Sequence, residues 1–232
     1  MSCSVSNPGG FNHPETTQSM SLLAFDFDGT LSDSEMTVLL GERCGVAAEV
    51  ETVTRRAMND EIGYAESLRE RVALFEGLTT ADVRDAFDDV RLRPGAETIL
   101  DALAAADVST AILTGGFERG VEAALAREDV SVDHVVANRL LVEDGALTGG
   151  VEGPLIEGTK DDALADLTAE YGLDPAETVA VGDGANDLPM LEVAGLAVGF
   201  EPKPAVAPVC DVVVSSMDEL REELVSADVL SV

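Results

Sequence analysis

Basic residues are scarce in this sequence. Its 232 residues include two lysines, two histidines and no tryptophan, whereas aspartate and glutamate together number 45. The resulting formal net charge of −31 repels the phosphates of nucleic acids and the head groups of anionic lipids. We therefore expect neither a nucleic-acid partner nor a membrane partner.

Long apolar runs and a cysteine framework are also missing. No apolar run reaches the roughly 18 residues that a membrane-spanning helix needs. The sequence does not open with basic residues and an apolar run, so no secretory signal is visible. Cys3, Cys44 and Cys210 form neither a metal-binding spacing nor a disulfide framework. These features predict a cytoplasmic protein with reduced thiols.

The acidity does not indicate a disordered chain. Disorder requires low hydrophobicity, but 46% of the residues here are hydrophobic. We therefore expect a folded protein, and its composition resembles that of proteins from extreme halophiles. Residues 1–20 are the exception, because their polar composition predicts a disordered tail. Met20 directly precedes the first apolar run and is an alternative to Met1 as the start of translation.

Apolar runs alternate with helical patterns along most of the chain. This alternation predicts an α/β fold with a Rossmann-like parallel sheet, helices on both faces and a small helical cap inserted after the first strand. We expect the core of the fold at 21–34 and 91–232 and the inserted cap at 35–90. The expected strands are 22–25, 108–113, 178–181, 196–199 and 211–214, with a hairpin at 134–152 turning at Asp144-Gly145.

Acidic residues follow two of the buried strands. Asp26 and Asp28 come after 22–25, and Asp183 and Asp187 come after 178–181. Ligands of open α/β sheets bind at the carboxyl ends of the strands, so these carboxylates are expected to converge. A site with oxygen ligands alone suits a hard divalent cation, and Mg²⁺ best fits phosphate chemistry.

The two retained lysines stand out in so acidic a chain. Lys160 opens an expected helix after Gly158-Thr159, a position that suits a point charge for phosphate; the alternative is a stray surface lysine. Lys203 lies in the proline-rich loop 202–208, to which we assign no role.

Four motifs together resemble those of the haloacid dehalogenase-like phosphatase superfamily. They are Asp26-Phe27-Asp28-Gly29-Thr30, Thr114-Gly115-Gly116, Lys160 and Gly182-Asp183-Gly184-Ala185-Asn186-Asp187, in that order. The resemblance covers about residues 20 to 225. Gly29 and Thr114 stand where many members of the phosphoserine phosphatase family have serine.

The resemblance implies a role for each matching residue. Asp26 would be the nucleophile that forms an aspartyl-phosphate, and Asp28 would be the general acid and then the general base. The carboxylates of Asp26 and Asp183 and the backbone carbonyl of Asp28 would hold Mg²⁺. Asp187 would support the metal or Lys160 without binding the substrate. The residues that would bind the phosphate are Thr114, Gly115, Gly116, Lys160 and Asn186.

The expected cap resembles that of the phosphoserine phosphatase family. The matching segments are Ala57-Met58, Tyr64, Ser67–Val72 and Glu35, together with Ala137–Leu140 and the Asp144-Gly145 hairpin. The resemblance implies that Glu35 binds the amino group and Arg71 the carboxylate of serine, while Met58 and Tyr64 line the pocket.

Helical spacing independently draws attention to Arg71. It lies three residues after Leu68 and four before Phe75, on their apolar stripe, where an arginine requires an anion. The alternatives are an internal salt bridge or a snorkelling surface arginine. Glu35 alone is weaker evidence, because a glutamate near a helix start is also favoured by the helix dipole.

Three functions remain open from the sequence. The first is a phosphoserine phosphatase that completes serine synthesis, acting as a monomer or homodimer. The second is a related phosphatase or phosphotransferase for another small phosphate, such as phosphoglycolate or homoserine phosphate. The third, a non-catalytic binding module, is disfavoured because Asp26, Asp28, Lys160 and Asp183 are all present.

Overall fold

The computed structural model describes residues 22–59 and 61–231. The expected tail and the question of the starting methionine lie outside these residues. In the described part of the chain, seven strands form one sheet in the order β4-β3-β2-β1-β5-β6-β7. The strands are β1 (Leu22–Phe25), β2 (Ser109–Phe117), β3 (His134–Glu143), β4 (Ala146–Glu152), β5 (Thr178–Gly182), β6 (Leu196–Phe200) and β7 (Val212–Val214).

The sheet is parallel except at one edge. Each neighbouring pair from β3 to β7 runs in the same direction, whereas β4 runs antiparallel to β3. The two are joined by a tight turn at Asp144 and Gly145, both with positive φ (49° and 80°), the turn that the Asp-Gly dipeptide predicts. The predicted parallel sheet and the hairpin are confirmed.

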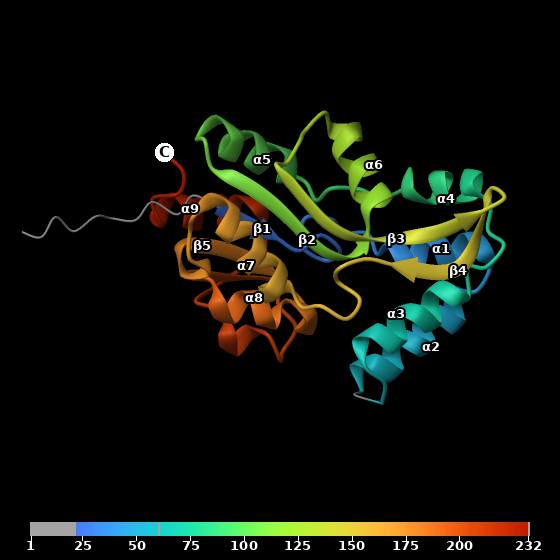
Figure 1. The fold of residues 1–232 in the computed structure, drawn as a ribbon. Helices are drawn as coiled ribbons and strands as arrows, with labels where there is room; N and C mark the ends of the chain where they lie inside the picture. Colours follow the sequence, from blue (N-terminus) through green and yellow to red (C-terminus); the bar gives the residue numbers. More distant parts are fainter. Residues whose placement is uncertain (1–21, 60, 232) are drawn as a thin grey trace, which may run out of the picture.

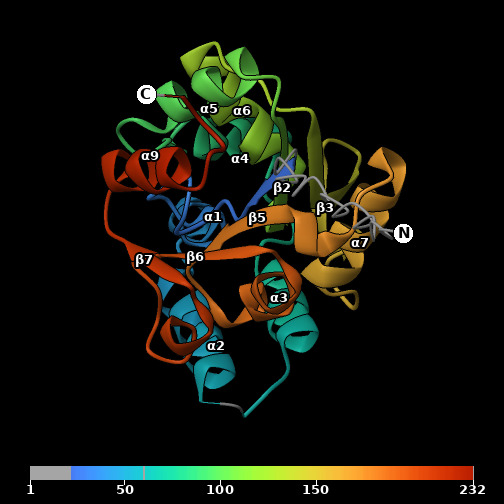
Figure 2. The ribbon, with the colours of Figure 1, turned by 90° about the vertical axis from the view of Figure 1, so that its left-hand side faces the viewer.

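Side-chain alternation divides the core between the two faces of the sheet. In β1, Leu23 and Phe25 belong to one apolar cluster, and Leu22 and Ala24 belong to the other. The first cluster takes residues from α5 (Ala96–Ala105), α6 (Glu118–Glu128) and α9 (Met217–Ser226); the second takes residues from α7 (Lys160–Tyr171) and α8 (Leu188–Val193). Figure 2 shows α5, α6 and α9 together above the sheet. The predicted helices on both faces are confirmed.

Four helices lie between β1 and α5 in the chain: α1 (Met36–Cys44), α2 (Ala47–Met58), α3 (Tyr64–Ala73) and α4 (Thr80–Phe87). In Figure 1, α1, α2 and α3 lie toward the same end as the β3–β4 hairpin. Backbone hydrogen bonds join this helical segment to β4, from Gly77 N to the Leu147 carbonyl and from Leu147 N to the Leu78 carbonyl, each 2.8 Å. The helical nature of 35–90 is as predicted, and its standing as a separate cap stays a prediction.

Strand β2 is longer than the sequence indicates. It continues through Thr114-Gly115-Gly116 to Phe117, whereas we expected it to end at Leu113. After an irregularity in register, Phe117 pairs with Asn138 of β3. Pairing with β3 therefore extends β2 beyond Leu113. Three 3₁₀ helices complete the described structure, at Pro175–Glu177, Ala185–Asp187 and Ala207–Val209. No helix within 22–59 or 61–231 is long and apolar enough to cross a membrane.

Raising the salt concentration should stabilise this fold. Apart from Asp26, Asp28, Asp183 and Asp187, the described acidic side chains are exposed or half-buried, so their carboxylates repel one another at or near the surface. Because the Debye length shortens from about 10 Å at 0.1 M to about 3 Å at 1 M, molar salt confines this repulsion to near neighbours. We expect the melting temperature to rise markedly between about 0.1 M and about 2 M KCl at constant Mg²⁺. A flat or falling melting temperature would contradict this interpretation of the charge.

Candidate active site

The acidic residues meet at the carboxyl ends of β1 and β5. Parallel pairing sets Phe25 level with Val181, and the backbone N–H of Asp26 donates to the Val181 carbonyl at 2.8 Å. Asp183 follows directly after β5. Carboxylate oxygens from Asp26, Asp183 and Asp187 lie within 4.8 Å of one another, and all three residues are buried. The sheet register therefore produces the convergence that the strand ends predict.

Lys160 is inserted among these carboxylates. It is the first residue of α7 and is 3% exposed. Its Nζ lies 2.5 Å from Oδ1 of Asp26 and 2.6 Å from Oδ1 of Asp187. One ammonium group thus bridges two acidic residues, which excludes the alternative of a stray surface lysine.

Asp187 uses both of its carboxylate oxygens within the protein. Oδ1 accepts from Lys160, and Oδ2 accepts from the backbone N–H groups of Asp183 at 2.9 Å and Gly184 at 2.8 Å. A Cβ at Gly182 would lie 2.6 Å from the Asp187 side chain, so the end of β5 requires glycine there. Asp187 therefore orients Lys160 and the loop that carries Asp183.

The one buried lysine, Lys160, does not balance the charge of the three buried carboxylates. Burial and the charge of Asp187 raise the pKa of Asp26 to about 7, while Lys160 acts in the opposite direction. Burial lowers the pKa of Lys160, but Asp187 and Asp26 outweigh it and the pKa is raised overall. Burial also raises the pKa of Asp183, against the effect of Lys203. The cluster therefore favours an additional cation.

Asp28 is suited to holding a proton. Burial raises its pKa well above the ordinary value, and the charges of Glu35 and Asp26 raise it further. Its Oδ1 is buried and has no hydrogen-bond partner among the described residues. A Cβ at Gly116 would lie 2.9 Å from Oδ2 of Asp28, so the carboxyl group packs directly against the end of β2. This arrangement fits a general acid beside Asp26.

The motif Thr114-Gly115-Gly116 forms part of β2 rather than a loop after it. Oγ1 of Thr114 accepts the backbone N–H of Gly116 at 2.9 Å. The Gly115 carbonyl accepts a hydrogen bond from Nδ2 of Asn138 at 3.0 Å. In this arrangement the Gly116 N–H, which the resemblance assigns to phosphate, is paired within the strand.

Tyr64 reaches from α3 to the end of β2. A Cβ at Gly115 would lie 1.7 Å from the Tyr64 hydroxyl, so the phenol occupies the space that only glycine leaves open. Burial raises the pKa of Tyr64 to about 12, although Lys160 and Arg71 lower it. Tyr64 thus places an aromatic ring over the strand end beside the carboxylates.

Arg71 has no acidic partner within ion-pair distance among the described residues. It is half-buried; Nη1 donates to Oγ1 of Thr37 at 3.2 Å, and Nε donates to a backbone carbonyl one turn earlier at 3.3 Å. Burial lowers the pKa of Arg71, while the charges of Tyr64 and Glu35 raise it. The structure therefore does not support the alternative of an internal salt bridge.

The remaining predicted residues differ in placement. Glu35 precedes α1, but its side chain makes no capping hydrogen bond, so capping does not explain its presence. Burial raises the pKa of Glu35, and Lys203 lowers it. Asn186 is exposed in the 3₁₀ helix that follows β5, and Met58 is 72% exposed at the end of α2. The structure does not bring Met58 to the carboxylates.

A family model for haloacid dehalogenase-like hydrolases matches residues 23–192, which is more than half of the chain. The matched region contains the buried cluster described above and Lys160. The chain belongs to this family.

Relatives of this haloacid dehalogenase-like hydrolase include phosphatases that match it over most of both chains. A phosphoserine phosphatase from Halobacterium salinarum is 54% identical over 205 residues, covering 88% of this chain and 97% of that protein. A solved structure of a phospho-aspartyl intermediate analogue of phosphoserine phosphatase has a TM-score of 0.81 at 34% identity, covering 88% of this chain and 98% of that one. A substrate-bound phosphoserine phosphatase complex has a TM-score of 0.80 at 35% identity, covering 88% and 96%.

The sequence did not predict the contacts of two basic side chains, Lys203 and Arg93, near the site. Nζ of Lys203 lies 2.9 Å from Oδ2 of Asp183. Arg93 donates from Nη2 to the Gly29 carbonyl at 3.0 Å and pairs with Glu201 at 3.1 Å, with its guanidinium 4.8 Å from the Phe200 ring centre. The scarcity of lysine was a signal for Lys203 as much as for Lys160, whereas no sequence pattern marks Arg93.

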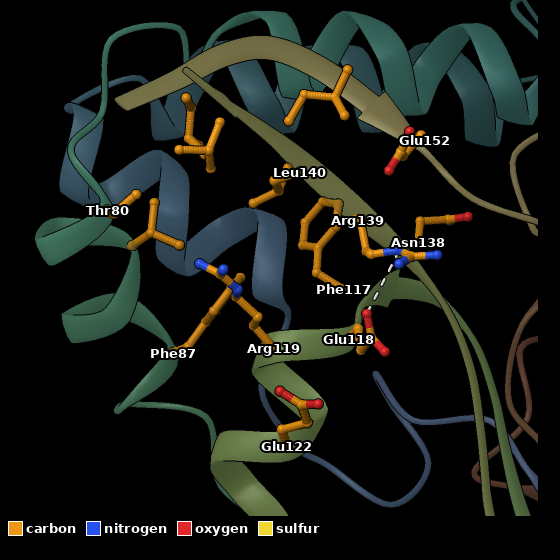
Figure 3. Close-up of a pocket in the computed structure, with 14 residues that line it drawn as sticks. Thr80, Phe87, Phe117, Glu118, Arg119, Glu122, Asn138, Arg139, Leu140 and Glu152 are labelled. Atoms are coloured by element: carbon orange, nitrogen blue, oxygen red, sulfur yellow. Dashed lines mark ion pairs between the residues drawn. The ribbon is translucent and has the colours of Figure 1, made fainter. Parts of the chain in front are cut away.

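A separate cavity of about 410 Å³ lies between α4, α6 and the β3–β4 hairpin. Figure 3 shows its rim, where Arg139 and Glu118 form an ion pair at 3.7 Å. None of the predicted site residues lines it. Asn138 connects the cavity with the candidate site, because the same side chain that borders the cavity donates a hydrogen bond to the Gly115 carbonyl.

Proposed function

We propose that this hydrolase is a magnesium-dependent phosphoserine phosphatase with Asp26 as the nucleophile. The phosphatase relatives and the pairing of Asp26 with Lys160 in a buried acidic cluster support the reaction. The observation that carries the substrate assignment is Arg71, a half-buried arginine without an acidic partner in the described residues, whose charge acts on Tyr64 and Glu35. A substrate carboxylate would provide that missing anion.

The residues fit a magnesium ion. The donors are all oxygens, which suits a hard cation, and burial raises the pKa values of Asp26 and Asp183, an effect that a bound cation would offset. The carboxylates of Asp26 and Asp183, with the backbone carbonyl of Asp28, would hold the ion. Asp187 is less suited, because both of its oxygens are already engaged. When bound, the ion would offset negative charge on the phosphoryl oxygens.

Magnesium should stabilise the protein more at high pH than at low pH. The folded-state pKa of Asp26 is raised from 3.8 to about 7, and that of Asp183 is raised as well. A raised carboxyl pKa means that the folded state binds the proton more tightly, so ionisation between these values destabilises the metal-free fold. Metal binding requires the ionised form. We expect the increase in melting temperature caused by MgCl₂ to be larger at about pH 8 than at about pH 5.

The measurement should be made in about 2 M KCl, where surface repulsion is screened. EDTA-treated protein at each pH provides the reference. An increase in melting temperature that is equal at both pH values, or larger at the lower one, would contradict a site built from these carboxylates.

In the first half of the reaction, a carboxylate oxygen of Asp26 attacks phosphorus. The bond from phosphorus to the serine oxygen breaks, and Asp28 gives its proton to that oxygen, so serine leaves neutral at its hydroxyl. Lys160 holds Oδ1 of Asp26 and lowers the pKa of that carboxyl, which keeps the nucleophile available. The product on the protein is a phosphoryl group on Asp26.

In the second half, Asp28 acts as the base. Its carboxylate takes a proton from water while the water oxygen attacks phosphorus, and the bond between phosphorus and Asp26 breaks. Inorganic phosphate leaves, Asp26 is again a carboxylate and Asp28 again holds a proton. The raised pKa of Asp28 favours this return to the protonated state.

Arg71 and Glu35 would recognise the serine part of the substrate. Arg71 presents a planar fork of donors that matches a carboxylate, and Glu35 has the opposite charge to the substrate ammonium. Tyr64 would enclose the substrate from the side of α3, against Gly115. The exposed Met58 remains a predicted pocket residue, for which this structure shows no contact with the cluster.

Replacing Arg71 by alanine should impair the hydrolysis of phosphoserine far more than that of phosphoethanolamine. Only phosphoserine has a carboxylate, and a charge-assisted hydrogen bond contributes about 1.5–3 kcal/mol, or roughly ten- to hundredfold in kcat/KM. The matched control is Arg69→Ala, because Arg69 lies on the same helix, is half exposed and pairs with Glu157 at 2.6 Å. Equal losses on both substrates in the Arg71 variant would show that Arg71 has only a structural role.

We also propose a place for this reaction in the cell. Release of serine from phosphoserine would complete serine synthesis. A cytoplasmic location agrees with the three widely separated cysteines, which form no disulfide framework in the sequence. A panel of phosphoserine, phosphothreonine, phosphoglycolate and an aryl phosphate tests the substrate directly. A preference for phosphoglycolate would favour the second of the three functions left open by the sequence.

A further inference from the structure

Lys203 contacts Asp183 at two points. Its Nζ lies 2.9 Å from Oδ2 of Asp183, and its backbone N–H donates to the Asp183 carbonyl at 2.9 Å. The chain has two lysines, and both contact members of the buried acidic cluster. The position of Lys203 is therefore fixed relative to Asp183 by the main chain as well as by the side chain.

The loop that carries Lys203 is itself anchored. Val206 is fully buried beneath it and donates its backbone N–H to the Lys203 carbonyl at 2.8 Å. Before Lys203, Glu201 pairs with Arg93, and Arg93 donates to the carbonyl of Gly29 in the loop after β1. The loop after β6 thus connects the segment that contains Asp26 and Asp28 with the segment that contains Asp183.

The Asp183 carboxylate is confined on two sides. A Cβ at Gly29, where φ is +94°, would lie 2.9 Å from Oδ1 and Oδ2 of Asp183, so the carboxylate packs tightly against that loop. On the other side, the ammonium group of Lys203 pairs with Oδ2 of Asp183. Within the described residues no donor forms a hydrogen bond to Oδ1. Lys203 therefore leaves one defined oxygen of Asp183 available to another cation.

We propose that Lys203 is a positioning residue of the metal site, which holds Oδ2 of Asp183 so that Oδ1 is presented to the ion. This inference rests on the proposed function, because it assumes that Asp183 is a metal ligand. Partners that orient the ligands of a metal typically change metal affinity by about ten- to hundredfold when they are removed. The side chain of Lys203 is 52% exposed, so its replacement is compatible with folding.

Simple charge repulsion predicts the opposite effect. Lys203 is a cation near the site of another cation, so its removal would tighten metal binding if its charge were all that mattered. The sign of the change therefore separates positioning from repulsion or competition. Measurement in about 2 M KCl reduces the contribution of long-range charge.

The test is the dissociation constant of MgCl₂, measured by titration calorimetry without substrate. Lys203→Met removes the charge and the donors at similar length, and we expect the dissociation constant to rise about ten- to hundredfold. Lys203→Arg retains a charged donor and should recover most of the affinity. Arg84→Gln removes one exposed positive charge elsewhere, on α4, and should leave the affinity unchanged.

Each outcome has a separate meaning. Mg²⁺ binding by the wild type tests the proposed metal site, and the difference between wild type and Lys203→Met tests this inference. Unchanged or tighter binding in Lys203→Met would overturn the positioning role and leave the proposed function intact. Equal weakening in Lys203→Arg and Lys203→Met would also overturn it, because the charged donor would then have no effect.

Discussion

Replacing Asp26 by asparagine should lower kcat by about four orders of magnitude or more. The amide keeps the shape of the side chain but cannot attack phosphorus as a carboxylate. The fold should survive, because Lys160 retains Asp187 as a partner at 2.6 Å and the substitution removes a charge that Asp187 repels. Phosphate release from phosphoserine and the melting temperature, measured together, check both expectations.

The matched control for this variant is Asp33→Asn. Asp33 is an exposed aspartate in the same segment after β1, so its replacement changes the net charge equally. Beryllium fluoride should inhibit the wild type by mimicking phosphorylated Asp26, and should bind Asp26→Asn far more weakly. Ordinary turnover by Asp26→Asn, with deamidation excluded by mass spectrometry, would contradict the nucleophile assignment.

Replacing Lys160 by methionine should destabilise the metal-free protein by about 3–5 kcal/mol. Lys160 is 3% exposed and is the ammonium that pairs with both Asp26 and Asp187, so its removal leaves two buried carboxylates without a counter-ion. Since Lys160 lowers the pKa of Asp26, its loss raises that pKa above about 7. The destabilisation should therefore be largest at high pH and should shrink as Asp26 takes up a proton. Urea unfolding across the pH range measures it.

A double-mutant cycle makes this prediction specific. If the cost arises from the Lys160–Asp26 pair, Asp26→Asn combined with Lys160→Met should be more stable than the sum of the two single effects predicts, by about 0.5–3 kcal/mol. Additive effects, or a destabilisation that grows as the pH falls, would show that the cost comes from lost packing instead.

The strand pattern predicted most of the core because each strand signal is local. Buried runs such as 22–25 and 178–181 end in acidic residues, and the parallel register then sets Asp26 and Asp183 at one edge of the sheet. The local pattern did not predict where β2 ends. Whether Thr114-Gly115-Gly116 continues the strand depends on pairing with β3, a contact that local sequence does not contain.

Partners far apart in the chain were the hardest to predict. The sequence marked Arg71 as needing an anion, but only the structure shows that no acidic residue of the described chain pairs with it. The sequence likewise showed that Lys203 is one of two lysines, while its contact with Asp183 depends on the path of the loop after β6. Arg93 contacts two distant segments, one through the Gly29 carbonyl and one through the adjacent Phe200 ring and Glu201 carboxylate. Partners of such different kinds leave no spacing pattern in the sequence.

The proposed mechanism requires that a phosphoryl group pass from phosphoserine to Asp26. Rapid acid quenching of the wild type with phosphorus-labelled phosphoserine and MgCl₂, followed by peptide mass spectrometry, tests this step directly. We expect label on the peptide that contains Asp26, appearing before free phosphate accumulates, and no label in Asp26→Asn. Label on a different residue, or release of phosphate in a single turnover with no labelled protein at any time, would contradict the account.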